Sequence, residues 1–151
     1  MVSPVGVKGP LLVEGTPVRN ELLIGLPRPE CDSICPALTF VPLRTHDVLH
    51  ESEQLIKYAY FVDCGMVSIL SVMQDGKSVE VGLTGKEGCT GLPLFAGFKS
   101  SDTRAVVQIE GSAFRISSAS LEKVLRRCPV LARRVAQFAL FMGLQGSGGR
   151  L

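Results

Sequence analysis

The two histidines are the side chains best suited to hold a metal ion, but their spacing fits such a site poorly. His46 and His50 lie four residues apart, with the acidic residues Asp47, Glu51 and Glu53 close by. On a strand, residues four apart face the same side but stand too far apart to share one ion. The chain has no third histidine. We therefore interpret these side chains as polar surface residues and predict no metal.

The number and spacing of the cysteines favour free thiols. An odd count, scattered through apolar stretches, does not fit a disulfide framework. The first two form a C-x3-C pair, with no second pair at the spacing of a zinc site. We therefore expect buried or partly exposed free thiols. The five residues are Cys31, Cys35, Cys64, Cys89 and Cys128.

The sequence contains no pattern that is typical of a catalytic nucleophile. It has no G-x-S-x-G turn, and neither histidine stands next to a Ser or Cys motif. The segment GKEGCTG is rich in glycine, but it does not end in Gly-Lys-Ser/Thr, as a P-loop does. We therefore predict that the chain is not an enzyme.

Length and composition predict one soluble domain. The chain has 151 residues, of which 46% are hydrophobic and 20% charged, so it can bury a core and is too apolar to be disordered throughout. The net charge of +2 is too small to indicate nucleic-acid binding. Neither a secretory signal nor an apolar run of about 20 residues is present, so we expect a cytoplasmic protein. The one basic cluster has the spacing of the solvent-facing side of two helices: Arg126, Arg127, Arg133 and Arg134.

Residues 36–117 have the pattern of an antiparallel β-structure. Short apolar or alternating segments, such as YAYFVDCG and MVSILSVM, recur between turn residues. The Asp75-Gly76 pair separates two of them and is a strong hairpin signal. No strand–helix–strand alternation appears, which favours a roll or sandwich over a parallel sheet. The glycine-rich segment 85–98 predicts a compact loop with one helical turn, and loops on a rigid sheet often carry function.

The segment before the strands predicts a leader and a short helix. Residues 1–18 contain several Gly and Pro and no clean period, which indicates a flexible leader. Asn20 is a candidate N-cap for a short helix with an apolar face of leucines. Pro27 and Pro29 are expected to end that helix.

After residue 117 the apolar period becomes helical. Residues 118–128 predict one helix, capped by Ser118 or Ser120, and residues 129–145 predict a second that starts at Pro129. The second helix can pack on the roll as core or pair with its copy like a coiled coil, and we favour the homodimer. The tail at residues 146–151 has a linker-like composition. The apolar stripe of the second helix consists of Val135, Phe138, Ala139 and Met142.

The order of these elements, and several segments, resemble the regulatory domain of the Crp/Fnr family of transcription regulators. NELLIGLP is similar to the family's opening helix, and DVLHESEQLIKYAYFVDCGMVSIL to the passage that leads into its glycine-bounded hairpin. DGKSVEVGLTGKEGCTGLPLFAG resembles the passage into its nucleotide-binding loop. The likeness runs from Asn20 to Gln145. It implies a mainly β fold, a jelly-roll-like double-stranded β-roll of the cyclic-nucleotide-binding type over residues 19–117, with a short N-terminal helix and C-terminal helices over residues 118–145 that include a dimerisation helix.

The resemblance also implies where an effector binds. The family's cassette commonly reads Phe-Gly-Glu-Leu/Ile-Ala, a variable loop, then Arg-Ser/Thr-Ala. Its backbone N–H groups and Arg bind the cyclic phosphate, and its Glu accepts from the ribose hydroxyl. The effector would be a cyclic nucleotide or another small anionic molecule. The matching positions are Gly91, Leu92, Pro93, Thr103, Arg104 and Ala105.

Two of the matching positions lack the residues of the family. Leu92 stands in the position of the Glu, and alignment on Ala105 places Thr103 in the position of the Arg. A shift by one residue would make Arg104 the phosphate ligand, but it misplaces the strand alternation that follows. Each lost hydrogen bond of this kind costs about 1–3 kcal/mol. We therefore predict that the chain does not bind cAMP or cGMP through the usual cassette.

Together these features predict the sensory domain of a Crp/Fnr-like transcription regulator. An effector in the β-roll would shift the dimer helix between two arrangements. We expect contact with DNA only through a helix-turn-helix domain that this chain does not contain, and we expect no membrane partner. Two alternatives stay open. One is a cupin-like metal-binding β-roll enzyme, although that group uses a His-x-His pair which is missing here. The other is a degenerate roll that serves only for dimerisation.

Overall fold

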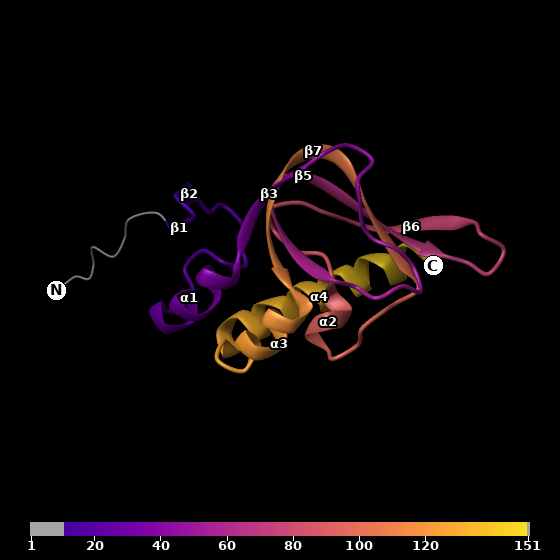
Figure 1. Ribbon diagram of the computed structural model, residues 1–151. Helices are drawn as coiled ribbons and strands as arrows, with labels where there is room; N and C mark the ends of the chain where they lie inside the picture. Colours follow the sequence, from indigo (N-terminus) through magenta and orange to yellow (C-terminus); the bar gives the residue numbers. More distant parts are fainter. Residues whose placement is uncertain (1–10, 151) are drawn as a thin grey trace.

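The computed structural model describes residues 11–150, and the side chains of residues 11–143. Its main body is a curved antiparallel sheet with helices packed against one end (Figure 1). The sheet has five strands: β3 (Thr39–Leu43), β4 (Val48–His50), β5 (Tyr58–Val72), β6 (Ser78–Thr84) and β7 (Thr103–Ser117). The helices are α1 (Arg28–Ile34), η2 (Cys35–Ala37), α2 (Leu92–Phe95), α3 (Ser118–Leu125) and α4 (Pro129–Arg150). The predicted mainly β fold with flanking helices is therefore confirmed.

The long strand β7 is the centre of the sheet. The strand order is β3-β7-β5-β6, and β4 pairs with another part of β7. The β5–β7 ladder shifts register between Val62 and Val67. At this point the two backbones approach so closely that a Cβ on Gly111 would collide with the Cys64 carbonyl, and Gly65 adopts a φ of 94°. Glycines at this bend allow both long strands to curve, which turns a flat sheet into a roll.

The β5–β6 hairpin has the turn that the sequence predicts. Strand β5 ends at Val72 and strand β6 begins at Ser78, with the Asp75-Gly76 pair between them. The Asp75 carboxylate accepts a hydrogen bond from the Lys77 N–H, and the backbone N–H of Met73 donates to the carbonyl of Lys77. This local chemistry fixes which residues of the two strands face each other.

Two apolar clusters hold the roll together. One lies inside the roll and includes Leu43, Val67 and Val107. The larger lies where the roll meets the helices and includes Phe61 and Phe114 with residues of α1, α3 and α4. Because this second cluster joins sheet and helices, burial of apolar area fixes the position of α4 against the roll.

Residues 11–18, expected to belong to a flexible leader, are instead ordered. They form a two-stranded hairpin of β1 (Leu12–Val13) and β2 (Thr16–Pro17). Val13 and Val18 are buried in the larger cluster, which is the physical reason for the order. The rest of the expected leader, residues 1–10, lies outside the described residues.

The helix expected to start at Asn20 is a turn, and the first helix follows it. The Asn20 side chain accepts from the N–H of Leu22, as a cap would, but its amide also donates to the carbonyls of Val62 and Gly88. These bonds tie the turn to the roll. Helix α1 begins after Pro27, which was expected to end a helix. Pro29 lies in the first turn of α1, where a proline costs no hydrogen bond.

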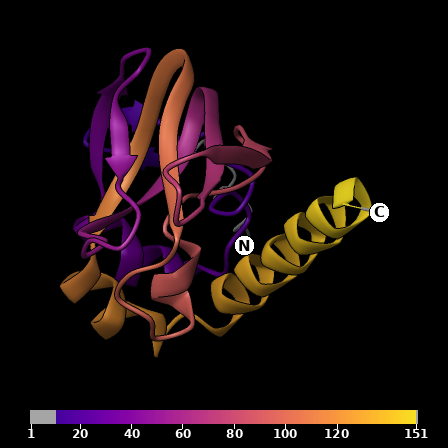
Figure 2. The same ribbon diagram turned by 90° about the vertical axis from the view of Figure 1, so that its right-hand side faces the viewer.

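The two C-terminal helices have the predicted order but different ends. Ser117, rather than Ser118 or Ser120, caps α3, accepting from the N–H of Ser120 at 3.1 Å. Helix α4 begins at Pro129 as predicted. Residues 146–150, expected to be a linker-like tail, continue α4, because extending a helix costs far less than starting one. Figure 2 shows α4 leaving the base of the roll and diverging from it. In the described part of the chain no helix is apolar enough over sufficient length to cross a membrane.

Candidate ligand-binding site

A cavity of about 450 Å³ lies between the roll, the glycine-rich segment and α4. This size is ordinary for a small-molecule site. The roll contributes Ile69 from β5 and Val81 from β6, and α4 contributes Ala139 and Met142. The cavity is therefore bounded by the sheet on one side and by the C-terminal helix on the other.

The glycine-rich segment forms one wall of the cavity through the short helix α2. Gly91 precedes this helix with a φ of 78°, and a Cβ on it would lie 3.1 Å from the Tyr58 carbonyl oxygen. Both the backbone angle and the close approach favour glycine here. The turn places Leu92 and Pro93 against the cavity. The compact loop with one helical turn is therefore confirmed, and three predicted site residues, Gly91, Leu92 and Pro93, line the cavity.

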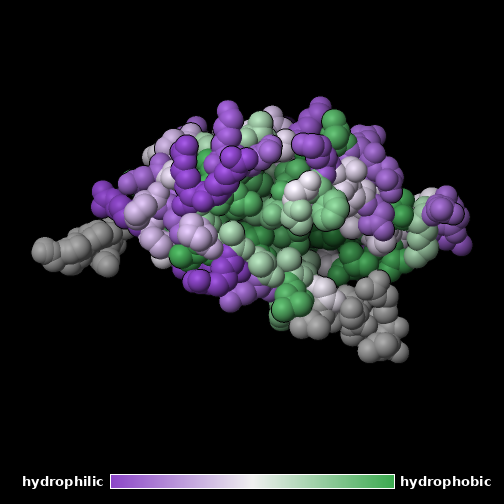
Figure 3. All heavy atoms as spheres, turned by 90° about the horizontal axis from the view of Figure 1, so that it is seen from below, coloured by the Kyte–Doolittle hydropathy of each residue, from purple (hydrophilic) through white to green (hydrophobic). Residues whose placement is uncertain are grey.

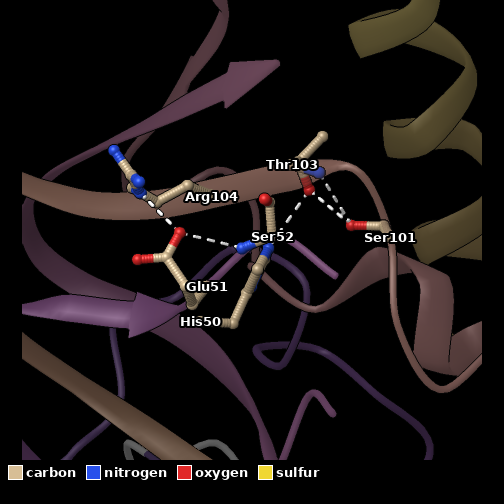
Figure 4. Close-up of polar contacts among 6 residues, drawn as sticks. All are labelled: His50, Glu51, Ser52, Ser101, Thr103 and Arg104. Carbon is tan, nitrogen blue, oxygen red and sulfur yellow. Dashed lines mark hydrogen bonds and ion pairs between the residues drawn. The ribbon is translucent and has the colours of Figure 1, made fainter. Parts of the chain in front are cut away.

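A chain of three polar side chains crosses the floor of the cavity. The His50 Nε2 atom lies 3.1 Å from the Thr103 Oγ1 atom, which lies 2.6 Å from the Ser101 Oγ atom. The N–H of Thr103 also donates to the Ser101 hydroxyl. Figure 4 shows these three side chains around the start of β7. His50 comes from the end of β4, so the pairing of β4 with β7 brings it to Thr103.

Two buried polar atoms at the cavity have no hydrogen-bond partner among the residues that the structure describes. They are the Nδ1 atom of His50 and the Oγ1 atom of Thr90. His50 is 7% exposed and Thr90 1% exposed, and both line the cavity. Buried polar atoms are nearly always paired, because an unmade bond costs about 1–3 kcal/mol. These two atoms therefore mark the part of the cavity where a ligand finds hydrogen-bonding partners.

Burial lowers the pKa of His50 below its ordinary value of 6.5. Desolvation penalises the charged imidazolium, and the neighbouring carboxylate of Glu51 opposes that effect only in part. The imidazole is therefore neutral at pH 7 and offers one donor and one acceptor nitrogen.

Arg104 points away from the cavity. Its Nε atom donates to the Glu51 Oε1 atom at 2.6 Å (Figure 4), and Arg104 is not among the residues that line the cavity. This bond lowers the pKa of the Glu51 carboxyl group. Ala105 is fully buried between β4 and β5. The alternation of β7 therefore places Thr103 at the cavity and Arg104 outside it.

The cavity wall carries almost no charge. Among the described residues that line it, Asp102 is the one charged side chain, and none is Lys or Arg. Leu92 stands where the resemblance implies a carboxylate. The described residues of the site can thus offer hydroxyls, a neutral imidazole and an apolar surface, but no cation for a phosphate.

The apolar stripe of α4, predicted to pair with a second copy, packs on the roll in this structure. Val135 and Phe138 are buried in the larger cluster, while Ala139 and Met142 line the cavity. Glycine permits the close approach of α4 to the roll, because a Cβ on Gly88 would collide with Phe138. The predicted dimer seam through these four residues stays a prediction, and two of them, Val135 and Phe138, are buried against the rest of the chain.

Sequence patterns alone did not reveal the residues that hold α4 in place. The buried Glu30 carboxylate of α1 accepts from the N–H groups of Val130 and Leu131, each at 3.0 Å. The Arg134 side chain donates to the carbonyls of Leu22, Ile24 and Gly25. Glu30 lies about 100 residues from the helix it caps, so no local motif could have predicted the pairing.

The other candidate ligand groups are not assembled into a site. His46 is exposed in the turn before β4, whereas His50 is buried at its end, so the two do not share a strand face as expected. All five cysteines are free, and burial raises the pKa of Cys35 to about 11. Within residues 11–143, no three His, Cys, Asp or Glu side chains gather at metal-binding distance.

The chain belongs to the cyclic nucleotide-binding domain family, because the model of that family matches residues 40–128, more than half of it. The resemblance to Crp/Fnr sensor domains found in the sequence is confirmed by this match and by the fold. No curated protein is significantly similar to the chain in sequence.

Several solved structures share this fold. The catabolite activator protein of Thermus thermophilus is 18% identical, with a TM-score of 0.66 over 85% of this chain and 60% of that one. The sensor domain of the regulator DNR from Pseudomonas aeruginosa is 16% identical, with a TM-score of 0.61 over 82% and 79%. A cAMP-bound mutant of the regulatory subunit of a cAMP-independent protein kinase A from Trypanosoma brucei is 18% identical, with a TM-score of 0.66 over 77% and 43%. The chain thus spans about half the length of two of these proteins.

Proposed function

We propose that this chain is the cytoplasmic sensory domain of a Crp/Fnr-like transcription regulator, in which a small effector binds the cavity and acts on α4. The proposal rests on the observation that both the sheet and α4 form walls of the cavity. Val81 belongs to the sheet and Met142 to α4, so one molecule in the cavity contacts both. A ligand that favours one position of α4 would shift the population of helix positions.

The similar structures support a regulatory role. They include a catabolite activator protein and the sensor domain of a transcriptional regulator. The fold of this chain matches them over 85% and 82% of its length. Contact with DNA would be made by a helix-turn-helix domain outside this chain, and pairing with a second copy would be made through α4.

The usual cyclic-nucleotide cassette is not the basis of this proposal. The Trypanosoma brucei kinase subunit is described as cAMP-independent, and its cAMP-bound form carries an arginine in place of a threonine. In this chain Thr103 faces the cavity and Arg104 does not. This placement supports an effector other than cAMP or cGMP.

The test is a thermal-shift screen of small molecules, followed by hydrogen exchange. An effector is expected to raise the melting temperature and to slow amide exchange in both α2 and α4. The control is Val81→Phe, which fills the cavity from the sheet and is expected to abolish both effects.

Two results would contradict the proposal. If a stabilising compound protects α2 but leaves exchange in α4 unchanged, the cavity is not coupled to the helix. If no compound stabilises the chain, a roll that serves only for dimerisation is the better description.

A further inference from the structure

The cavity described above has a chemical character that narrows its ligand, and this step rests on the proposed function. Its walls are mostly apolar, with contributions from Ile69, Val81, Leu92 and Met142. Its polar groups are concentrated on one side, in the chain of His50, Thr103 and Ser101 and in the nearby Thr90. A ligand that fits must therefore be apolar over most of its surface and polar at one end.

The described residues offer no positive charge to an anionic ligand in this cavity. The described lining residues include no Lys or Arg, and Asp102 adds one negative charge at the edge. The guanidinium of Arg104, the nearest candidate in sequence, is bonded to Glu51 on the other side of β7. A charge buried without a partner loses its hydration and gains little in return.

The unpaired atoms indicate what the polar end of the ligand must do. His50 Nδ1 and Thr90 Oγ1 are buried and have no hydrogen-bond partner within the described part of the chain. The Nδ1 atom is a donor or an acceptor according to the direction of the hydrogen bond between His50 and Thr103, and the Thr90 hydroxyl can be either. A group that both donates and accepts, such as a hydroxyl or a primary or secondary amide, satisfies either arrangement.

We infer that the effector is an uncharged small molecule whose hydroxyl or amide group bonds to His50 Nδ1 and Thr90 Oγ1, with an apolar body against Ile69 and Met142. This class excludes cyclic nucleotides, phosphates and carboxylates as ligands of the native cavity. The imidazole supports the assignment because it stays neutral at pH 7 and supplies no charge.

The experiment uses a fragment library in which every scaffold is present as a neutral amide or alcohol and as the matching carboxylate. Binding to the full chain is measured by ligand-observed NMR and calorimetry at pH 7. At least one neutral member is expected to bind, and at least about tenfold more tightly than its carboxylate partner. Guanosine and cyclic GMP form one further matched pair, in which only the second carries a phosphate.

Variants test the position of the bound fragment. His50→Phe and Thr90→Val are each expected to weaken neutral binding about fivefold to tenfold, because each leaves the ligand's polar group unpaired. Arg104→Ala is the matched control, and it should leave neutral binding unchanged because its side chain lies outside the cavity.

Addition of a cation should reverse the preference. Thr103→Arg is expected to favour the carboxylate over the amide. An arginine at position 103 also disturbs the bond to His50. Ser71→Arg is therefore a second variant that adds a cation to the cavity, because Ser71 pairs with Thr103 and lines the cavity. The inference is overturned if carboxylates bind the native chain at least as tightly as the amides, or if no neutral member binds.

The outcome is separable from that of the proposed function. A neutral ligand that binds but leaves α4 exchange unchanged supports this inference and contradicts the sensor proposal. An anionic ligand that binds and slows exchange in α4 contradicts this inference and supports the sensor proposal.

Discussion

At the scale of single residues, one step along β7 decides the chemistry of the site. Thr103 and Arg104 are neighbours, but strand alternation places the first in the cavity and the second against Glu51. The Arg104–Glu51 pair is about one-third exposed at each side chain, so it contributes at most about 1 kcal/mol to stability. The register of one strand thus removes a cation from the cavity.

Protonation of His50 is expected to make stability depend on pH. Its pKa is lowered by burial in the folded chain and is about 6.5 when unfolded. Below pH 6.5 the unfolded state therefore binds more protons than the folded state. Stability is full above this pH and falls as the pH decreases below it. Urea unfolding at pH 7.5 and pH 5.5 measures the loss, and His50→Asn should reduce it.

The matched control for this measurement is His46→Asn. His46 is exposed in a turn with a φ of 78°, a backbone angle that asparagine tolerates well. If His46→Asn reduces the loss of stability as much as His50→Asn does, the buried imidazole is not its source.

At the scale of elements, the position of α4 against the roll depends on two glycines of the roll. A Cβ on Gly88 would collide with Phe138, and one on Gly82 would collide with Met142. The first contact lies in the core and the second at the cavity. The separation between helix and sheet is therefore set by the absence of two side chains.

We expect Gly88→Ala to destabilise the chain by about 1–3 kcal/mol, because overpacking forces α4 away from the roll. Gly143→Ala is the matched substitution, since it lies in α4 with no atom within 4 Å of the new Cβ. Alanine there is expected to stabilise the helix by about 0.5–1 kcal/mol. Chemical denaturation of both variants measures the change in the free energy of unfolding. Equal changes in the two variants would show that Gly88 does not set the position of the helix.

At the scale of the whole molecule, α4 leaves apolar residues uncovered. Leu140 and Phe141 are 66% and 55% exposed, whereas Val135 and Phe138 of the same helix are buried. Seen from the helix side, apolar residues gather in the middle of the surface, bordered by hydrophilic ones (Figure 3). Large exposed apolar side chains on a diverging helix are typical of an interface.

Dimerisation is expected to use this outward face. Leu140→Glu with Phe141→Glu should weaken self-association at least about tenfold in sedimentation equilibrium, because both charges would be placed in the seam. The control is Leu55→Glu with Phe98→Glu, which changes two equally exposed apolar residues away from α4. A dimer that is unaffected by the first pair of substitutions, or a chain that stays monomeric at tens of micromolar, contradicts this arrangement.

The sequence predicted what depends on local chemistry. The Asp75-Gly76 turn, the helical turn after Gly91 and the start of α4 at Pro129 each follow from the preferences of a few neighbouring residues. The resemblance to a known family located the β-roll and four residues of the cavity wall.

Long-range contacts could not be predicted in this way. Asn20 forms a turn instead of a helix because its amide finds carbonyls on β5 and beside Cys89. His50 was interpreted as a surface residue because nothing in its own segment shows that β4 pairs with β7. The stripe on α4 fits a dimer and a core equally well by period, so the period alone does not predict that Val135 and Phe138 are buried in the larger cluster.

The hydrogen bonds between the Glu30 carboxylate and the start of α4 fix this end of the helix, so that α4 acts as a lever. Val130 and Leu131 are held by the buried carboxylate, and Arg134 adds a second attachment one turn later. Met142, at the cavity, lies about 18 Å along the axis from Val130, and Arg150 about 30 Å, at about 1.5 Å per residue. A tilt that moves Met142 by about 1 Å therefore moves the far end of a rigid helix by about 1.7 Å. A ligand that contacts the middle of α4 thus produces its largest displacement where the helix is farthest from the roll.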